Sequence, residues 1–258
     1  MCLIVIGWRA HPEYPLVVAA NRDEFLARPA SPAHWWTDAP SILAGRDLEA
    51  GGTWMGITRG GRFAALTNYR DPTVRRPGAP SRGALVRDCL SMPDQVTATL
   101  ERVAQVSAGY AGFNLLVGDG KELGIHESTT GVVRLLDAGI YGLSNHLLDT
   151  PWPKVRLARE RFEVAMTRLP CEEDFVHLLS DRTPAPDEHL PATGVSPDWE
   201  RWLSPAFIRA PGYGTRCTTL LVVRSDGSTR LREMTWQDDG NLASEVTHHF
   251  TSSRATSY

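Results

Sequence analysis

Two apolar runs near the N-terminus constrain the fold of this chain more than any other stretch. The first covers residues 2–6, and the second covers residues 17–20 and ends abruptly in the polar segment Asn21–Glu24. We expect a first buried strand and a second strand that returns beside it. Polar side chains at the end of a buried strand cost free energy unless they are paired or face a cleft. This segment therefore predicts either a site at that end or a turn closed by an Arg–Asp ion pair.

A cysteine directly follows the initiator methionine. Because Cys2 is small, we expect Met1 to be removed, which would leave an N-terminal cysteine. Its α-amine would have a pKa of about 7.7–8.0 and would serve as a base for the thiol, so that one residue supplies both nucleophile and base. We expect Arg22, with Asp23 or Glu24, to hold the amine and keep the thiolate ionised. The alternative is an ordinary small apolar residue in a buried strand.

The composition excludes several classes of protein. Of the 258 residues, 42% are hydrophobic and 22% are charged, as in ordinary globular proteins. The net charge of −3 gives no electrostatic reason to bind nucleic acid. No apolar run approaches the roughly 20 residues that span a bilayer, and no secretory signal is recognisable. The cysteines at positions 2, 89, 171 and 217 form neither a zinc motif nor a disulfide framework. We expect a cytoplasmic protein without a transmembrane segment or a metal.

The order of the expected elements indicates the fold class. Strands and helices are expected in the following order: strands up to residue 68, helices over 81–107, strands over 113–143, helices over 150–180 and a hairpin over 218–236. Residues 28–43 are expected to be irregular, and residues 183–214, rich in proline and glycine, to form a functional loop or lid. Strands, then helices, then strands again, with no linker between independent cores, predict one α+β layered domain over residues 1–258.

Several sequence blocks, collinear over nearly the whole chain, carry a family resemblance. They lie at residues 1–4 (MCLI), 20–25 (ANRDEF), 51–56 (GGTWMG), 66–72 (LTNYRDP), 112–115 (GFNL), 141–145 (YGLSN), 150–154 (TPWPK) and 214–219 (GTRCTT). On these blocks the chain is identified as a member of the NRDE family, also called the transport and Golgi organisation protein 2 family. That resemblance brings an association with lipid homeostasis and with acyl-CoA and haem trafficking.

A more distant similarity links the chain to the cysteine N-terminal-nucleophile hydrolases of the choloylglycine hydrolase type. It implies a four-layer αββα sandwich, in which two antiparallel sheets are stacked between helical layers. It also implies roles for individual residues. Cys2 would attack a carbonyl, and Asp23 or Glu24 would orient the α-amine. Asn145 would donate its side-chain amide to the oxyanion, and Arg216 would be a fixed positive charge beside the thiolate.

The chain departs from the hydrolase pattern at two places. In those hydrolases two residues separate the first arginine from its aspartate, whereas Arg22 and Asp23 are adjacent here. Adjacent residues on a strand point to opposite faces, so a bulge or turn is needed for both to face Cys2. The hydrolases also place an asparagine at a hairpin turn, where this chain has Thr58–Gly60 and a backbone N–H would serve instead.

A second polar segment also follows an apolar strand. Asn68–Arg70 would line the same end of the sheets as Asn21–Glu24, or would form a polar turn that closes a hairpin. Trp54, after two glycines, would be a wall of the pocket or a core residue. The expected substrate-binding residues are therefore Asn21, Glu24, Trp54, Asn68, Tyr69 and Arg70.

Two function classes remain open. The first is a cofactor-independent hydrolase that cleaves an amide or thioester bond of a small hydrophobic or amphipathic substrate through Cys2. The second is a non-enzymatic carrier on the same fold for haem, acyl-CoA or another lipid-like ligand. The sequence has no c-type haem motif, so any haem would be bound non-covalently. The fold alone does not decide between them.

Overall fold

The computed structural model describes residues 2–73 and 78–252, which form two antiparallel sheets. Sheet A has the strand order β10 (Gly139–Leu143), β1 (Cys2–Trp8), β2 (Leu16–Phe25), β12 (Tyr213–Val223), β13 (Ser228–Trp236), β14 (Leu242–Thr251), with β11 (Arg209–Ala210) paired to β12. Sheet B has the order β3 (Ala30–Trp35), β4 (Ile42–Asp47), β5 (Met55–Thr58), β6 (Phe63–Asn68), β7 (Phe113–Gly118), β8 (Leu123–Glu127), β9 (Val132–Leu135).

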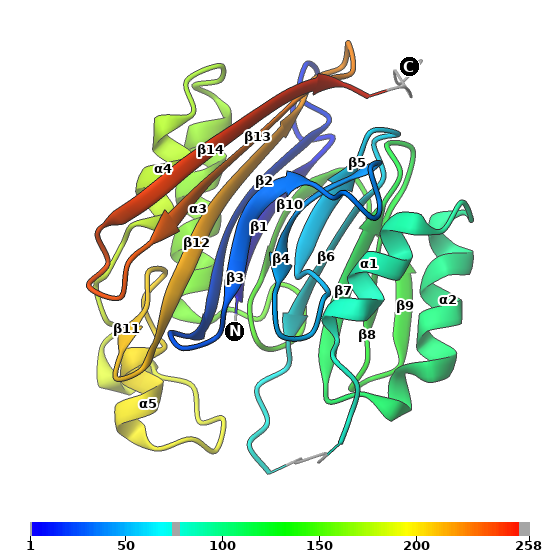
Figure 1. Ribbon diagram of the computed structural model, residues 1–258. Coiled ribbons are helices and arrows are strands. Elements are labelled where there is room, and N and C mark those ends of the chain that lie inside the picture. The colour runs from blue at the N-terminus through cyan, green and yellow to red at the C-terminus, as the bar shows by residue number, and fades with distance from the viewer. Residues whose placement is uncertain (1, 74–77, 253–258) are drawn as a thin grey trace.

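Helices cover the outer face of each sheet. Sheet A is covered by α3 (Pro153–Met166) and α4 (Glu173–Leu179), and sheet B by α1 (Gly83–Ser91) and α2 (Val96–Val106) (Figure 1). A short helix, α5 (Pro197–Trp202), lies beyond one end of sheet A, and 3₁₀ turns occur at Ser107–Gly109 and Asp187–His189. The predicted αββα sandwich is therefore confirmed.

The burial of both faces of β1 explains its unbroken apolar sequence. Ile4 and Ile6 belong to the core between the two sheets. Leu3 and Val5 point the other way and pack with α3, where the fully buried Phe162 lies. A strand covered on both faces has no polar side, so its residues do not alternate in character. Packing on both faces holds the first residue of β1 at one end of the sandwich.

Two expectations about loops were wrong. Residues 28–43 contain β3 and the start of β4, and Pro32 lies within β3. Because β3 is an edge strand with a register shift between Ser31 and His34, the missing N–H of the proline removes no ladder bond. Residues 183–214 contain α5 and β11 rather than loop alone. None of the described helices is both long and apolar enough to cross a bilayer.

Candidate active site

A cavity of about 470 Å³ opens at the end of the sandwich where β1 begins. Cys2 is paired in register with Arg22 on β2, and Arg22 is paired on its other side with Cys217 on β12. These three residues of sheet A line the cavity together with Trp54 and Asn68 of the sheet B side. The two polar segments that end buried strands thus meet at one end of the sheets. Met1, whose removal is expected, lies outside the described residues.

The Cys2 thiol is protonated near neutral pH. Its side chain is buried, with 5% of the residue exposed, and burial raises its pKa to about 11. The Asp23 carboxylate raises this pKa further, while the Arg22 charge and a hydrogen bond from the Asp23 backbone N–H lower it. The expectation that the neighbours keep the thiolate of an N-terminal Cys2 ionised stays a prediction, since burial opposes it here. A thiol of this kind needs a base at the moment of attack.

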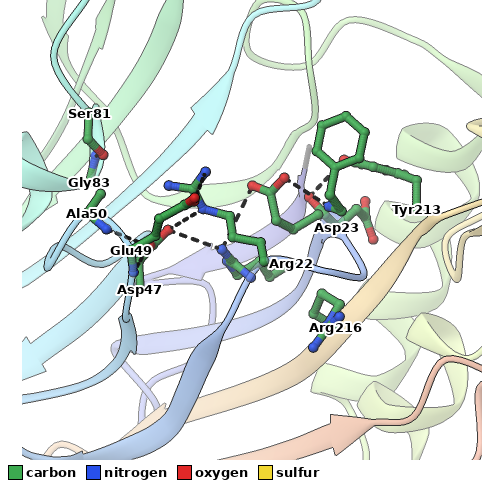
Figure 2. A network of polar contacts seen from close by, with 12 residues as sticks. Arg22, Asp23, Asp47, Glu49, Ala50, Ser81, Gly83, Tyr213 and Arg216 are labelled. Atoms are coloured by element: carbon green, nitrogen blue, oxygen red, sulfur yellow. Dashed lines mark hydrogen bonds and ion pairs between the residues drawn. The ribbon is translucent and has the colours of Figure 1, made fainter.

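Arg22 and Asp23 both line the cavity, and residues of β12 hold Asp23. The pairing of β2 with β12 shifts register between Thr215 and Cys217, which is a bulge on β12 and not on β2. The Thr215 hydroxyl donates to Asp23 Oδ1 at 2.7 Å. The Tyr213 hydroxyl donates to the Asp23 backbone carbonyl at 2.8 Å (Figure 2). Burial raises the pKa of Asp23, which its cationic neighbours oppose.

Arg216, the residue at the bulge, lines the cavity but directs its guanidinium elsewhere. Its Nη1 donates to the backbone carbonyl of Leu26 and lies 3.9 Å from Asp238 Oδ1. The arginine whose charge acts on the Cys2 thiol is Arg22. The position beside the sulfur that the hydrolase resemblance implies for Arg216 is thus held by Arg22 in this structure.

Asn145 lies behind the cavity wall. It is fully buried, its Nδ2 donates to the backbone carbonyl of Asn68 at 2.9 Å, and it is not among the described residues that line the cavity. Its neighbour Ser144 donates to the Cys2 carbonyl at 3.1 Å and to Asn145 Oδ1 at 3.3 Å. Asn145 therefore fixes the position of Asn68 relative to β1, and Asn68 presents its side chain at the cavity.

Three other residues that were expected to bind substrate are not among the described residues that line the cavity. Asn21 faces the helical layer, where its Nδ2 donates to the carbonyls of Leu179 at 2.9 Å and Ala206 at 2.8 Å. The Tyr69 ring packs against the His146 ring, with centroids 5.0 Å apart. Arg70 forms a buried ion pair, described next. Glu24, by contrast, lines the cavity as expected.

A buried group of charges behind Asp23 was not predicted from the sequence. Arg70 Nη1 lies 2.8 Å from Glu200 Oε2 of α5, with only 5% and 6% of their side chains exposed. Lys154, in the first turn of α3, is buried and donates from Nζ to the Leu203 carbonyl at 2.9 Å. Burial lowers the pKa of Lys154 to about 8, an effect that the Asp23 charge opposes. A lysine at the start of a helix ordinarily signals a solvated face, so nothing local indicated its burial.

Glu233 and Cys217 are further cavity residues that sequence reasoning missed. Glu233 Oε1 accepts from the Ala33 backbone N–H at 2.7 Å, which ties β13 to β3 of the other sheet. Burial raises the pKa of both Glu233 and Cys217. Within residues 2–73 and 78–252, no cluster of three or more His, Cys, Asp or Glu side chains is arranged to hold a metal ion.

Comparison with known proteins identifies the family. The family model for Transport and Golgi organisation 2 matches residues 1–238. The chain belongs to this family. The Transport and Golgi organization protein 2 homolog of Bos taurus is 35% identical over 272 residues, covering 96% of this chain and 98% of its own. The Homo sapiens homolog is 34% identical over 263 residues, covering 92% and 94%.

Solved structures similar to this family member include the following two. The mutant C2A conjugated bile acid hydrolase from Clostridium perfringens has a TM-score of 0.50 at 9% identity, covering 99% of this chain and 98% of that chain. A Caenorhabditis elegans N-acylethanolamine-hydrolyzing acid amidase ortholog has a TM-score of 0.49 at 10% identity, covering 86% and 92%. At such identities the likeness to the bile acid hydrolase shows the fold, that of the N-terminal-nucleophile hydrolases, and nothing finer.

Proposed function

We propose that the protein is an N-terminal-nucleophile hydrolase that cleaves an amide or thioester bond of a small amphipathic substrate through Cys2, after removal of Met1. The observation that carries this proposal is the position of Cys2 at the start of β1, in the wall of a cavity and beside Arg22 and Asp23. A cysteine that served only to pack a strand would have no need of an open cavity and two flanking charges.

The α-amine of Cys2 is the base in this proposal. An N-terminal amine has a pKa of about 7.7–8.0, so it accepts the thiol proton near neutral pH, although the thiol itself is protonated. Asp23, held by Thr215 and within the same wall, orients that amine. The arrangement places nucleophile, base and orienting acid within one pair of strands.

The reaction then proceeds in two balanced steps. The Cys2 sulfur bonds to the carbonyl carbon while its proton passes to the α-amine and on to the leaving nitrogen or sulfur, whose bond to the carbonyl carbon breaks. Water attacks the resulting thioester, loses a proton to the same amine, and releases a carboxylic acid and the free thiol. Asn68 and backbone N–H groups at the cavity wall stabilise the oxyanion, and one such donor contributes about 2.7–4 kcal/mol to catalysis. Asn145 supports Asn68 in this role.

This mechanism requires no cofactor, because thiol and amine supply the chemistry. The alternative, a carrier for a lipid-like ligand, is favoured by one observation, the raised pKa of Cys2. A haem carried in this cavity would be bound non-covalently. Among the described lining residues the thiol donors for its iron would be Cys2 and Cys217. Burial raises the pKa of both, so each would lose its proton on binding the iron.

Turnover of chromogenic amides tests the proposal. A series of fatty-acyl p-nitroanilides of increasing chain length should release p-nitroaniline with the wild type and not with Cys2→Ala. The matched control is Cys171→Ala, because Cys171 is an exposed free cysteine outside the cavity lining. Its activity should equal that of the wild type. Saturable binding of the same amides without release by the wild type would favour the carrier.

A further inference from the structure

The walls of the cavity carry more positive than negative side chains, although the whole chain has a net charge of −3. Among the described residues, five arginines and four carboxylic acids line it: Arg22, Arg28, Arg46, Arg82 and Arg216 against Asp23, Glu24, Asp47 and Glu233. Burial favours the neutral forms of Asp23 and Glu233, since it raises the pKa of each. The described cavity walls therefore carry at least one more positive than negative charge.

Three of these arginines are already held by partners within the chain. Arg28 donates to Asp47 at 2.6 Å, Arg46 makes two bonds of 2.7 Å to Asp38, and Arg216 donates to the Leu26 carbonyl. Asp47 also accepts from the backbone N–H groups of Glu49 and Ala50 (Figure 2). Because these groups satisfy one another, they leave two guanidinium groups, those of Arg22 and Arg82, for a bound molecule.

Arg22 is nine-tenths buried and incompletely bonded. Its nearest carboxylate oxygens, on Asp47 at 3.7 Å and Glu24 at 3.8 Å from Nη2, lie beyond hydrogen-bond distance. Its Nη1 has no hydrogen-bond partner among the described residues. A buried charged donor without an acceptor is costly, and an oxygen of a ligand in the cavity would remove that cost. Figure 2 shows Arg22 in the middle of the polar network, between Asp47 and Asp23.

Arg82 faces the same cavity from the sheet B side. Its Nη1 donates to the Gly112 carbonyl at 2.9 Å, but none of the described carboxylate oxygens forms an ion pair with it. Burial lowers the pKa of Arg82, an effect that the charge of Glu24 opposes, and Arg82 lines the same cavity as Cys2. Arg82 is thus a cation whose counter-ion the described chain does not supply.

The start of α1 borders the cavity beside Arg82. Ser81 and Gly83 line the cavity on either side of Arg82, and the nine-residue helix that begins at Gly83 has no acidic residue in its first turn. Its first N–H groups already have partners: that of Gly83 donates to Ser81 Oγ at 3.3 Å, and those of Ala84 and Leu85 donate to the carbonyls of Ser81 and Arg82. The helix start therefore sets no carboxylate beside Arg82, and the donors for a bound anion are the two arginines.

We infer that Arg22 Nη1 and Arg82 form a subsite for an anionic group of the substrate, a carboxylate or a phosphate, in the cavity whose wall holds Cys2. The inference rests on the proposed function, because only under that function is the bound ligand a substrate. It narrows the substrate to an amide or thioester that also carries such an anion. Arginine suits this task because its fork of donors matches the oxygens of either group.

Calorimetric titration of the full chain with simple anions tests the subsite. The Cys2→Ala variant is used, so that binding is measured without turnover, and the probes are hexanoate, its neutral isostere hexanamide, and inorganic phosphate at constant ionic strength. We expect hexanoate or phosphate to bind saturably and more tightly than hexanamide. A preference for hexanoate identifies a carboxylate subsite, and a preference for phosphate identifies a phosphate subsite.

Two second-site substitutions decide whether binding occurs at the inferred subsite. Arg82→Gln should weaken anion binding about tenfold, equivalent to about 1.4 kcal/mol. The side chain of Arg82 makes no capping bond to α1, so the helix should survive this change. The matched control is Arg87→Gln on the exposed face of the same helix, where the arginine pairs with Asp88, and it should leave binding unchanged. If Arg82→Gln does not fold, Arg22→Lys should weaken binding in its place.

The inference is overturned if neither anion binds saturably, or if Cys2→Ala alone binds no more tightly than Cys2→Ala combined with Arg82→Gln or with Arg22→Lys. Failure of the proposed function has a different signature. In that case the anions still bind and respond to Arg82→Gln, while the wild type releases no p-nitroaniline from any acyl amide.

Discussion

Replacing Lys154 by methionine should change how the stability of the protein depends on pH. Burial lowers the pKa of this ammonium group from its ordinary 10.5 to about 8. Between these two values the unfolded chain holds a proton that the folded chain has lost. The contribution of Lys154 to the free energy of unfolding therefore rises with pH across this window. The size of the pKa difference corresponds to about 3 kcal/mol.

Urea unfolding followed by tryptophan fluorescence, from below pH 8 to above pH 10.5, measures this effect. The free energy of unfolding of the wild type minus that of Lys154→Met should rise by about 3 kcal/mol across the window. Taking the difference cancels the contributions that the titrating cysteines and tyrosines, which both proteins share, make to the free energy of unfolding. Lys121→Met is the matched control, since Lys121 is exposed, and its difference from the wild type should stay flat. Parallel pH profiles for the wild type and Lys154→Met would refute the reasoning.

Two further substitutions, each with a control, test the packing around the site by urea unfolding. Glu200→Gln should destabilise by about 3–5 kcal/mol because it removes the carboxylate from the buried Arg70–Glu200 ion pair. Its neighbour Arg201→Gln, in exposed pairs, should cost at most about 1 kcal/mol, and equal effects would contradict this account. Gly52→Ala would place a Cβ 2.4 Å from the Gly83 carbonyl carbon and should cost about 1–3 kcal/mol. Gly109→Ala, which meets open space, should stay within about 0.5 kcal/mol.

The central strands and most helices were predictable because their signals are local. The continuous apolar run of β1 and the helical spacing of Val155, Ala158 and Phe162 each require only neighbouring residues to be interpreted. The helix expected from residue 150 begins at Pro153, which occupies its first turn. The edge strands β3 and β14 were missed, because an edge strand tolerates proline and exposed polar residues that an inner strand does not.

The chemistry of the site was harder to predict because it depends on contacts between distant segments. Arg70 and Glu200 are 130 positions apart, and neither local sequence indicates that its charge is buried. The partner of the Asp23 carboxylate is Thr215, which lies on another strand beside a register shift. The residues that could be found were those at the ends of apolar runs, where a polar side chain is conspicuous. Those that could not were buried charges such as Lys154, whose surroundings only the folded chain supplies.

Intact-mass analysis of a rapidly quenched reaction tests the central claim most directly. The purified protein should lack Met1, and during turnover of an acyl p-nitroanilide it should gain the mass of one acyl group, located on the N-terminal peptide that begins with Cys2. Cys2→Ala should show no adduct, and Cys171→Ala should show the same adduct as the wild type. An active protein that retains Met1, or that turns over without any acyl group on Cys2, would contradict the account.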